Sequence, residues 1–338
     1  MKQTAKKFTQ AYGPSGNEEQ IRNIIAKEIK PYVDRVYTDN LGSLIAHKKG
    51  AGKKLLFAAH MDEIGVIVNH IDDKGFLRFS PVGGVYPIIS LGQRVQFKDG
   101  LVGVVGVEFK DVPRGQVPPL SKMFIDIGAK GKKQAEKMIS IGDMACFTHE
   151  FIELSPDRWV SKAMDDRISC VTLTEAAKKL KKSPNDVYFV FTVQEEVGLR
   201  GSKTSTYSVN PDLGIAVDVT GTGDTPKGYT MAVELGKGPA LKMMDHSIVV
   251  TEGVKNFMKK AADKAKISVQ PEILQFGGTD AGAMQVTRGG IPAGCISIPT
   301  RYIHSPGEMI DRNDLEKAVQ WVVSIAQMDI GKHGFGNN

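Results

Sequence analysis

Histidine and carboxylate side chains stand at the ends of several short apolar runs, and these residue types are common ligands of divalent cations. One such run occupies residues 55–59 and is followed directly by a histidine. The residues placed in this way are His60, Glu195, Glu196 and Asp218. Continuous apolar runs are typical of strands covered on both faces of a parallel sheet. Because open α/β sheets hold their sites at the carboxyl ends of strands, we expect these side chains to converge.

Two further motifs supply the rest of a possible ligand set. Asp165 and Asp166 are adjacent and come just before a helix-like segment. They can cap that helix, or one of them can place its carboxylate between two cations, since adjacent side chains do not easily share one target. His304 follows a predicted strand over residues 291–298. A lone histidine is more often structural than a ligand, so its interpretation depends on the other motifs.

The paired glutamates suggest a division of labour. Glu195 and Glu196 end a predicted apolar strand, where two like charges without a cation should leave one carboxyl with a raised pKa. With metal present, one of them can be a ligand and the other can act as a general base. Asp62 lies two residues after His60, on the same side of an extended chain, and can fix the tautomer of that ring.

Each motif has a structural explanation when it is taken alone, but together they have the composition of a site for metal-assisted hydrolysis. Two histidines and three carboxylates can hold two divalent cations, and a bridging carboxylate keeps such cations roughly 3.5–4 Å apart. Nitrogen and oxygen ligands without cysteine favour Zn, Co or Mn. Glu195 is a fourth carboxylate and remains free for acid–base work.

The elements that would position these residues alternate between strand and helix at both ends of the chain. This alternation predicts a largely parallel sheet with helices on both faces. Between residues 69 and 159 the chain instead shows many short strand-like runs split by Gly, Pro and Asp. The sequence therefore predicts an α/β domain made of residues 1–68 and 160–338, with a β-rich domain of residues 69–159 inserted. Predicted helices include residues 132–139, 247–266 and 311–330.

Composition excludes several other classes of protein. The chain has 338 residues, 41% hydrophobic and 24% charged, as in an ordinary globular protein. Its formal charge of +6 comes with short lysine clusters, and no long basic stripe interleaved with aromatics points to nucleic acid. No run reaches the roughly 18 apolar residues of a membrane span. The three cysteines are isolated and lack CxxC spacing, so we expect a reduced, cytoplasmic protein that binds neither nucleic acid nor membranes.

The motifs taken in order are similar to those of a known family. The segments AAHMDEIG, KAMDDR, VQEEVGLRG, AVDVT, GGTDAGA and RYIHSP resemble the M42 family of metallo-aminopeptidases, the glutamyl and tetrahedral aminopeptidase group. The resemblance covers nearly the whole chain. It implies a mostly parallel-sheet, zinc-exopeptidase-like catalytic domain interrupted by a β-rich dimerisation domain. It also implies a homo-oligomer, the tetrahedral dodecamer built from dimers, that acts on peptides.

The resemblance also implies a ligand role for five residues. His60 and His304 would be terminal ligands, one for each metal ion, and Asp165 would bridge the two ions. Glu196 would complete the shell of one ion and Asp218 that of the other. The two ions would be Zn, Co or Mn.

Supporting roles follow from the same resemblance. Glu195 would be the catalytic base, and Asp62 would orient His60. The peptide bond between Asp165 and Asp166 would be cis.

Substrate preference and reaction class are less constrained. A preference for an acidic first residue is suggested by the resemblance to the glutamyl branch and by the basic net charge, with Arg301 as a candidate partner. Thr279 and Asp280 are candidates for shaping the pocket. Two alternatives remain open at this point. One is another metal-dependent amidohydrolase on the same scaffold, such as a deacylase or carboxypeptidase, and the other is a metal-binding protein without catalysis.

Overall fold

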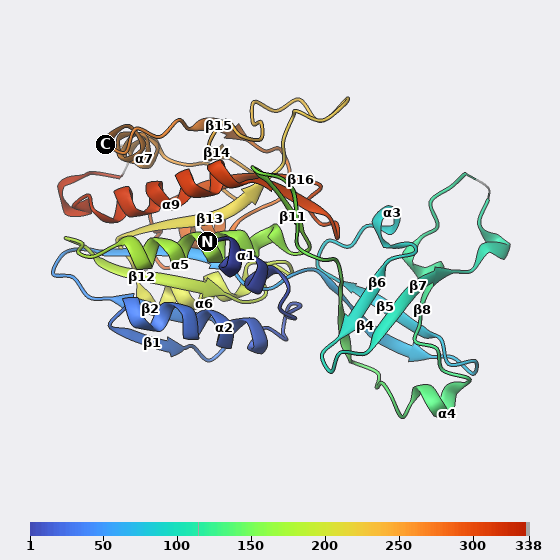
Figure 1. The fold of residues 1–338 in the computed structure, drawn as a ribbon. Helices are drawn as coiled ribbons and strands as arrows, with labels where there is room; N and C mark the ends of the chain where they lie inside the picture. Colours follow the sequence, from blue (N-terminus) through green and yellow to red (C-terminus); the bar gives the residue numbers. More distant parts are fainter. Residues whose placement is uncertain (114, 336–338) are drawn as a thin grey trace.

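The computed structural model describes residues 1–113 and 115–335, which form a large α/β body and a smaller β-barrel beside it (Figure 1). The barrel is built from the middle of the chain and the α/β body from both ends. The α/β body carries all of the residues expected to do chemistry. The predicted α/β fold, with a separate β-rich unit, is confirmed at this level.

An 11-stranded mixed sheet forms the centre of the α/β body. Its strands are β1 (Arg35–Thr38), β2 (Leu44–Lys48), β3 (Lys54–His60), β10 (Ile152–Ser155), β11 (Arg158–Ser161), β12 (Asp186–Thr192), β13 (Leu213–Thr220), β14 (Ala240–Met244), β15 (Gln270–Ile273), β16 (Ala293–Arg301) and β17 (Glu308–Asp311). The main path runs β1-β2-β12-β3-β13-β16-β17-β11-β10, and β14 and β15 attach beside β16. Strands β12, β3, β13 and β16 are parallel to one another, as their continuous apolar runs predict.

The parallel strands end together at one edge of the sheet. Thr192 of β12 lies opposite His60 of β3 in the pairing register. Asp218 of β13 lies opposite Ser297 of β16. The loops that follow these strands, including the one that carries Glu195, therefore open at the same edge, which is where sites form in open α/β sheets.

Helices cover both faces of the sheet. They are α1 (Lys2–Thr9), α2 (Glu19–Ile29), α5 (Met164–Lys179), α6 (Arg200–Val209), α7 (Glu252–Lys264), α8 (Asp280–Gln285) and α9 (Arg312–Ala326), with short 3-10 turns η1 (Lys30–Tyr32) and η4 (Ile330–Lys332). The barrel segment carries the short helices α3 (Pro87–Ser90) and α4 (Lys132–Ala135) and the 3-10 turns η2 (Phe109–Asp111) and η3 (Leu120–Lys122). Helices α5 and α9 pack against each other and lie in front of the sheet in Figure 1. Across the described residues, no helix has the length and apolar character needed to cross a membrane.

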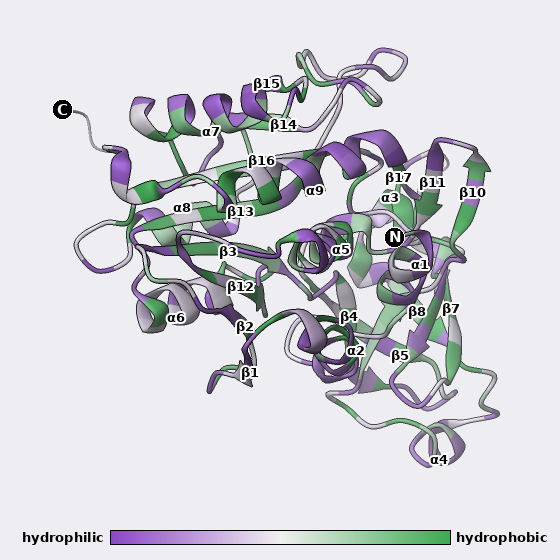
Figure 2. Cartoon of the chain, turned by 60° about the vertical axis from the view of Figure 1, so that its left-hand side comes forward, coloured by the Kyte–Doolittle hydropathy of each residue, from purple (hydrophilic) through white to green (hydrophobic). Residues whose placement is uncertain are grey.

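Two glycines show how closely the helices approach the central strands. A Cβ at Gly214 would lie 2.6 Å from the sulfur of Met284 in α8. A Cβ at Gly294 would lie 2.6 Å from the sulfur of Met258 in α7, on the side where Ile215 also points. Because successive strand residues face opposite sides, α7 and α8 lie on opposite faces of the sheet. Figure 2 shows the central strands largely in the colour of hydrophobic residues and the outer helix surfaces largely hydrophilic.

The small unit is a closed barrel with its own core. Its strands are β4 (Gly65–Ile71), β5 (Leu77–Val82), β6 (Arg94–Phe97), β7 (Val102–Val107), β8 (Met123–Asp126) and β9 (Met144–Phe147), in the order β4-β5-β8-β7-β6-β9. Val66, Val95 and Ile125 are fully buried in a cluster separate from the core of the α/β body. Closure leaves this unit without free sheet edges.

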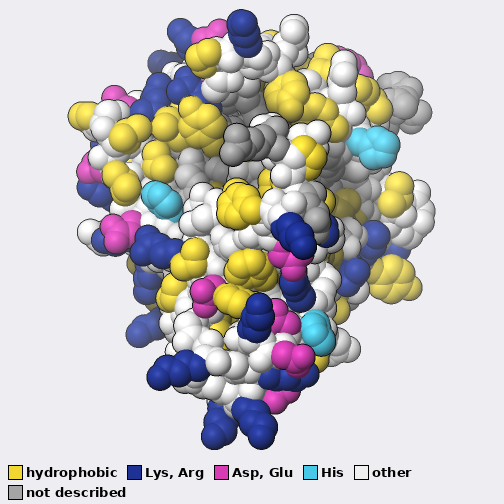
Figure 3. Space-filling model, turned by 90° about the vertical axis from the view of Figure 1, so that its right-hand side faces the viewer, with side chains coloured by type: hydrophobic (Ala, Val, Ile, Leu, Met, Phe, Trp, Pro, Cys, Tyr) yellow, Lys and Arg dark blue, Asp and Glu magenta, His cyan; other side chains and the backbone are white. Residues whose placement is uncertain are grey.

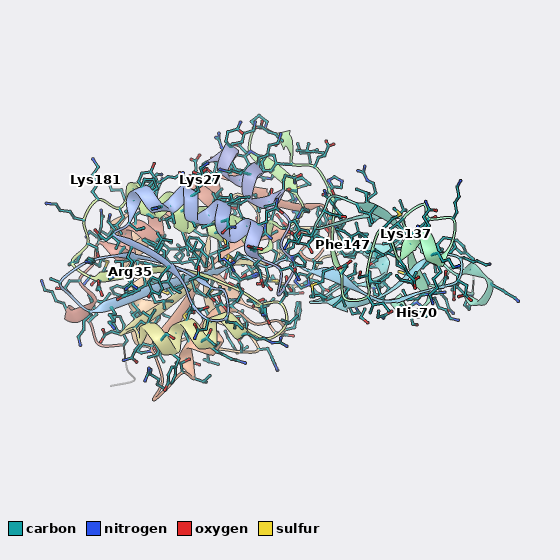
Figure 4. The ribbon with its side chains drawn as sticks, turned by 90° about the horizontal axis from the view of Figure 1, so that it is seen from below. Lys27, Arg35, His70, Lys137, Phe147 and Lys181 are labelled. Carbon is teal, nitrogen blue, oxygen red and sulfur yellow. The ribbon has the colours of Figure 1, made fainter. Side chains whose placement is uncertain are left out.

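The outer face of the barrel exposes apolar side chains. Figure 3 places the barrel nearest the viewer and shows hydrophobic side chains on this face, with lysines and arginines around them. The exposed large hydrophobic residues of this segment are Tyr86, Ile88, Leu91, Val102, Val104, Phe109, Val117 and Ile141. In Figure 4, His70 and Lys137 lie out on the barrel, whereas the buried Phe147 lies where the barrel meets the α/β body.

The β-rich segment predicted over residues 69–159 divides between two sheets. Barrel strands begin at Gly65 and end at Phe147. The next two strands, β10 and β11, join the large sheet through β17, where Trp159 pairs with Ile310. Trp159 is 1% exposed and belongs to the core of the α/β body, which explains why this hairpin is held there. Residues 69 and 159 stay predictions of domain boundaries.

Three predicted helices are shorter than the sequence suggests. The helix expected over residues 311–330 is α9, which ends at Ala326. The helix expected over residues 132–139 is α4, which ends at Ala135 and continues as turns. The helix expected over residues 247–266 is α7, which begins at Glu252. Asp245 Oδ1 accepts hydrogen bonds from the backbone N–H groups of Ser247 (2.7 Å) and Ile248 (3.0 Å). This turn competes with the first helical turn and delays the helix.

Candidate metal centre and active site

His60 is the last residue of β3, and its buried ring is surrounded by carboxylates. Nε2 lies 3.1 Å from Asp165 Oδ1 and 3.7 Å from Glu195 Oε2. Nδ1 lies 3.1 Å from the backbone carbonyl oxygen of Asp62 and 3.4 Å from its Oδ1. Contact of Nδ1 with Asp62 directs Nε2 toward the other carboxylates, which is the orientation of a metal-binding imidazole.

Asp165 lies between the two histidines and faces each ring with a different oxygen. Its Oδ1 is 3.1 Å from His60 Nε2, and its Oδ2 is 3.3 Å from His304 Nε2. The residue stands at the start of α5, and its peptide bond to Asp166 is cis, as the resemblance implies. A carboxylate that offers one oxygen to each side has the arrangement of a bridging ligand.

Glu196 and His304 occupy one side of Asp165. Glu196 Oε2 lies 3.2 Å from His304 Nε2. His304 Nδ1 lies 3.0 Å from the carbonyl oxygen of Gly84, in the segment after β5, so backbone from the barrel orients this ring. Ligand atoms of His60, Asp165 and Glu196 all lie within 4.8 Å of one another.

Asp218 occupies the other side of the cluster, near His60. Its Oδ1 accepts a hydrogen bond from the backbone N–H of Val219 (2.8 Å), which fixes the carboxylate at the end of β13. Ligand atoms of His60, Asp166 and Asp218 form a second group within 4.8 Å. The structure thus brings together every residue predicted to be a ligand, and it adds the second aspartate of the Asp165–Asp166 pair.

Glu195 lies beside the cluster but belongs to neither of the two groups of candidate ligand atoms. Its side chain is 11% exposed and lines the cavity above the cluster. Its backbone N–H donates to Asp62 Oδ1 at 3.0 Å. A carboxylate held beside the ligand cluster and open to the cavity has the placement of a general base.

Asp62 ties the two ligand-bearing loops together. It is fully buried, and its Oδ2 accepts hydrogen bonds from Ser15 Oγ (2.6 Å) and from the backbone N–H of Glu196 (3.2 Å). Its Oδ1 accepts from the backbone N–H of Glu195 and faces the His60 ring. One side chain therefore positions the histidine after β3 and both glutamates after β12.

Two carboxylates support the cluster, and of these only Glu308 had no place in the prediction from the sequence. Glu308 Oε2 accepts from the backbone N–H of Asp165 (2.9 Å), and its Oε1 accepts from that of His304 (2.8 Å). Asp166 Oδ2 accepts from the backbone N–H of His60 (3.1 Å). Glu308 is 2% exposed but follows Pro306 and a glycine in the sequence, a context that resembles an exposed turn. Its role comes from contacts between distant segments, so the local sequence held no signal for it.

The charges of the cluster are strongly unbalanced in the absence of cations. Burial raises the pKa of Glu195 and the pKa of Asp218 well above their ordinary values. Burial opposes the charged form of His60, yet Glu195 and Asp165 hold its pKa well above the ordinary value. Burial has the same effect on His304, but Glu196 and Asp165 raise its pKa to about 12. Bound protons thus compensate for surplus negative charge.

The residues present fit divalent cations. Besides the ligands, the buried Asp166 leaves Oδ1 without a hydrogen-bond partner, although it faces a polar cluster. An isolated buried carboxylate is costly unless it is paired or near a metal ion. The donors are imidazole nitrogens and carboxylate oxygens without thiolates, which suits Zn, Co or Mn. Cations would displace the protons that otherwise hold the cluster neutral.

A cavity of about 820 Å³ opens above the cluster. Its lining includes Arg301, but Thr279 and Asp280 do not belong to the described residues that line it. Both are 2% exposed: Thr279 caps α8, and Asp280 Oδ2 accepts a hydrogen bond from Thr192. His246 also lines the cavity.

A cluster of histidine and carboxylate side chains at the strand ends, with a further glutamate beside it, is typical of metal-dependent hydrolases. A family model described as M42 glutamyl aminopeptidase matches residues 42–321. The chain therefore belongs to the M42 family of aminopeptidases, and the resemblance seen in the sequence is confirmed.

Relatives of the chain cover nearly its full length. A protein of Acetivibrio thermocellus is 53% identical over 320 residues, 94% of this chain and 96% of its own. The lysyl aminopeptidase of Pyrococcus furiosus is 38% identical, with 93% of each chain covered. The glutamyl aminopeptidase of Lactococcus lactis is 31% identical, over 95% of this chain and 94% of its own.

Solved structures agree with this placement. The aminopeptidase APDkam598 of the archaeon Desulfurococcus kamchatkensis has a TM-score of 0.93 and 40% identity, over 96% of this chain and 94% of its own. The TET1 peptidase of Pyrococcus horikoshii, which can assemble into a tetrahedron or a large octahedral shell, has a TM-score of 0.86 and 36% identity, over 96% and 98%.

Proposed function

We propose that the protein is a two-metal aminopeptidase that removes the first residue from peptides. The observation that carries this proposal is the position of Asp165, whose two oxygens face His60 and His304 from opposite sides. His60, Asp165 and Asp218 would hold one divalent cation. Asp165, Glu196 and His304 would hold the other. Family membership supports the reaction class.

The cations and the glutamate have separate tasks. When bound, two divalent cations supply polarisation of the peptide carbonyl and lower the pKa of water. Glu195 removes a proton from the attacking water and later delivers it to the leaving amine. Asp62 holds the loop of Glu195 through its backbone N–H, so the base stays aligned with the cluster. The excess of carboxylates at the cavity floor also favours the free α-amine of a peptide over a blocked end.

The role of Glu195 is tested by Glu195→Gln, which keeps the size of the side chain and removes its basicity. We expect metal content and thermal unfolding to be unchanged, while kcat falls by roughly 10²–10⁴-fold. Glu316→Gln on the exposed surface of α9 is the matched control and should retain full activity. Near-normal turnover by the Glu195 variant would reject this residue as the base.

The reaction class is tested with free and N-blocked versions of the same peptides. An aminopeptidase cleaves the free peptide and ignores the blocked one, because the α-amine is part of recognition. Cleavage of blocked peptides would favour a deacylase, and release of the last residue would favour a carboxypeptidase. A metal-loaded sample that cleaves none of these substrates would indicate a metal-binding protein without catalysis.

We also propose that the protein is a homo-oligomer, the tetrahedral dodecamer built from dimers, with residues 69–159 as the dimerisation domain. The exposed apolar side chains of the barrel, among them Val104 and Phe109, support a subunit contact there. The assembly of the Pyrococcus horikoshii relative is further support. Light scattering checks the mass, and a Phe109→Asp variant that remained fully assembled would place the contact elsewhere.

The names of the relatives leave the preferred first residue open. The glutamyl aminopeptidase of Lactococcus lactis supports the acidic preference suggested by the sequence. The lysyl aminopeptidase of Pyrococcus furiosus is more similar to this chain and points to the opposite charge. The cavity itself is therefore the better guide to specificity.

A further inference from the structure

Apolar side chains form much of the wall of the cavity above the cluster. The apolar and aromatic residues that line it include Tyr86, Val219, Tyr229, Met231, Leu274 and Phe276. The rings of Tyr229 and Phe276 pack at a tilt with centroids 5.5 Å apart, yet they are 70% and 54% exposed. An exposed aromatic pair beside an active site offers a contact surface for an apolar group.

Among the described residues that line this cavity, Arg301 is the only lysine or arginine. Its guanidinium is already paired with the carboxylate of Asp224. Its Nε lies 3.0 Å from Asp224 Oδ1, and its Nη2 lies 2.7 Å from Asp224 Oδ2. Two parallel hydrogen bonds of this kind are the strongest form of an Arg–carboxylate pair. An acidic residue of a substrate would meet a guanidinium whose positive charge is already balanced by a carboxylate.

The pair is also built into the fold. Asp224 Oδ2 accepts the backbone N–H of Leu235 at 3.0 Å, which closes the loop between β13 and β14. Burial alone would raise the pKa of Asp224, but the hydrogen bonds from Arg301, Thr222 and the backbone of Leu235, with the charge of Arg301, together lower it to about 2. This loop carries Tyr229 and is the gold segment that extends from the α/β body in Figure 1. The pair is therefore fully ionised at neutral pH, and its two charges cancel.

The remaining charges at the cavity belong to the catalytic cluster. The carboxylates that line it are Asp165, Glu195, Glu196 and Asp218. They are needed for cations, catalysis and the α-amine, so a basic side chain finds no spare carboxylate on the apolar wall. Burying an unpaired charge is unfavourable, whereas burying an apolar side chain is favourable.

We propose that this enzyme prefers peptides whose first residue has a large aliphatic or aromatic side chain, and that Asp224 and Arg301 determine this preference by neutralising each other. The inference rests on the proposed aminopeptidase function and names its substrate class. It differs from the acidic preference expected from the sequence, because that expectation requires an Arg301 without a carboxylate partner.

The experiment compares kcat/KM of the metal-loaded enzyme for Leu, Phe, Glu and Lys reporters. Wild type should cleave Leu and Phe at least about 100-fold faster than Glu and Lys, since a charged side chain without a partner on an apolar wall is unfavourable. Asp224→Asn frees Arg301 and should raise the Glu-to-Leu ratio at least about tenfold. Arg301→Gln frees Asp224 and should raise the Lys-to-Leu ratio similarly.

Two controls separate charge from damage to the loop. Asp73→Asn removes the same charge from the exposed hairpin of the barrel and should leave every ratio unchanged. The double variant Asp224→Asn with Arg301→Gln should lose both gains and return to the wild-type ranking.

Each outcome decides one question. If wild type cleaves the Glu or Lys reporter with a kcat/KM equal to that for the Leu reporter, this inference is overturned and the aminopeptidase function stays intact. Ratios that stay fixed in both single variants overturn the role of the pair. Wild type that cleaves no reporter overturns the proposed function, and the inference falls with it.

Discussion

The carboxylate cluster and the cavity wall above it meet at the same edge of the sheet, but their charges are balanced in opposite ways. In the cluster, charges outnumber their partners: His60 and His304 face a larger set of carboxylates, and the imbalance is what cations would satisfy. At the wall, the charge of Arg301 is matched by Asp224 beside it, and apolar side chains form much of the remaining lining. We infer from this comparison that the unmatched charges of the cluster serve the reaction, and that the matched pair sets the substrate preference.

Removing the cations should have the largest effect, because it acts on the carboxylate cluster, whose charges are unmatched. A chelator should reduce activity by more than about 10⁴-fold, since the polarisation of the carbonyl and the acidity of water are both lost. Zn, Co or Mn should restore it, and elemental analysis should give two ions per chain. Retained activity in fully chelated protein would show that the cluster reacts without cations.

Asp62→Asn should act on every substrate alike. The buried carboxylate holds His60 and the backbone of Glu195 and Glu196, so its loss should weaken metal affinity by about 10–100-fold. Metal titration measures this, and the ratio between Leu and Ala reporters should not change.

Ser15→Ala is the graded control for that variant. It removes one donor to Asp62 and leaves the His60 side intact, so it should have a smaller effect. A change in substrate ranking caused by Asp62→Asn would contradict the separation between cluster and wall.

The sequence could predict the residues that lie at the ends of buried strands, but not those that act through contacts between distant segments. His60, the Glu195–Glu196 pair and Asp218 end buried strands, whose continuous apolar runs are visible in the sequence, so polar residues at their ends stand out. The α/β fold follows from the same runs. These positions depend on local pattern and on one general rule of sheet topology.

Residues that act through distant contacts could not be found in this way. Glu308 is buried because β17 pairs not only with the preceding strand β16 but also with β11, which lies far away in the chain. Asp224 lies in an irregular loop, and only the fold brings it to Arg301. The sequence therefore suggested Arg301 as a partner for acidic substrates, because its internal partner had no local signature.

The smallest expected effect is on stability, and it tests whether the Asp224–Arg301 pair is as firmly matched as the geometry indicates. The pKa of Asp224 is lowered to about 2 in the folded chain, below its ordinary value of 3.8. Its contribution to stability is therefore complete above pH 4 or so and is lost as the pH falls toward about 2. The pair is partly exposed, so we expect a contribution of only about 1 kcal/mol.

The measurement compares wild type with Asp224→Asn as metal-free proteins, so that protonation of the cluster affects both equally. Their difference in the free energy of unfolding should be the same at pH 7 and pH 5 and should shrink by pH 3. A difference that grows toward acid would mean that Asp224 is protonated in the fold. The charge of Arg301 at the cavity would then be unmatched, as the charges of the carboxylate cluster are.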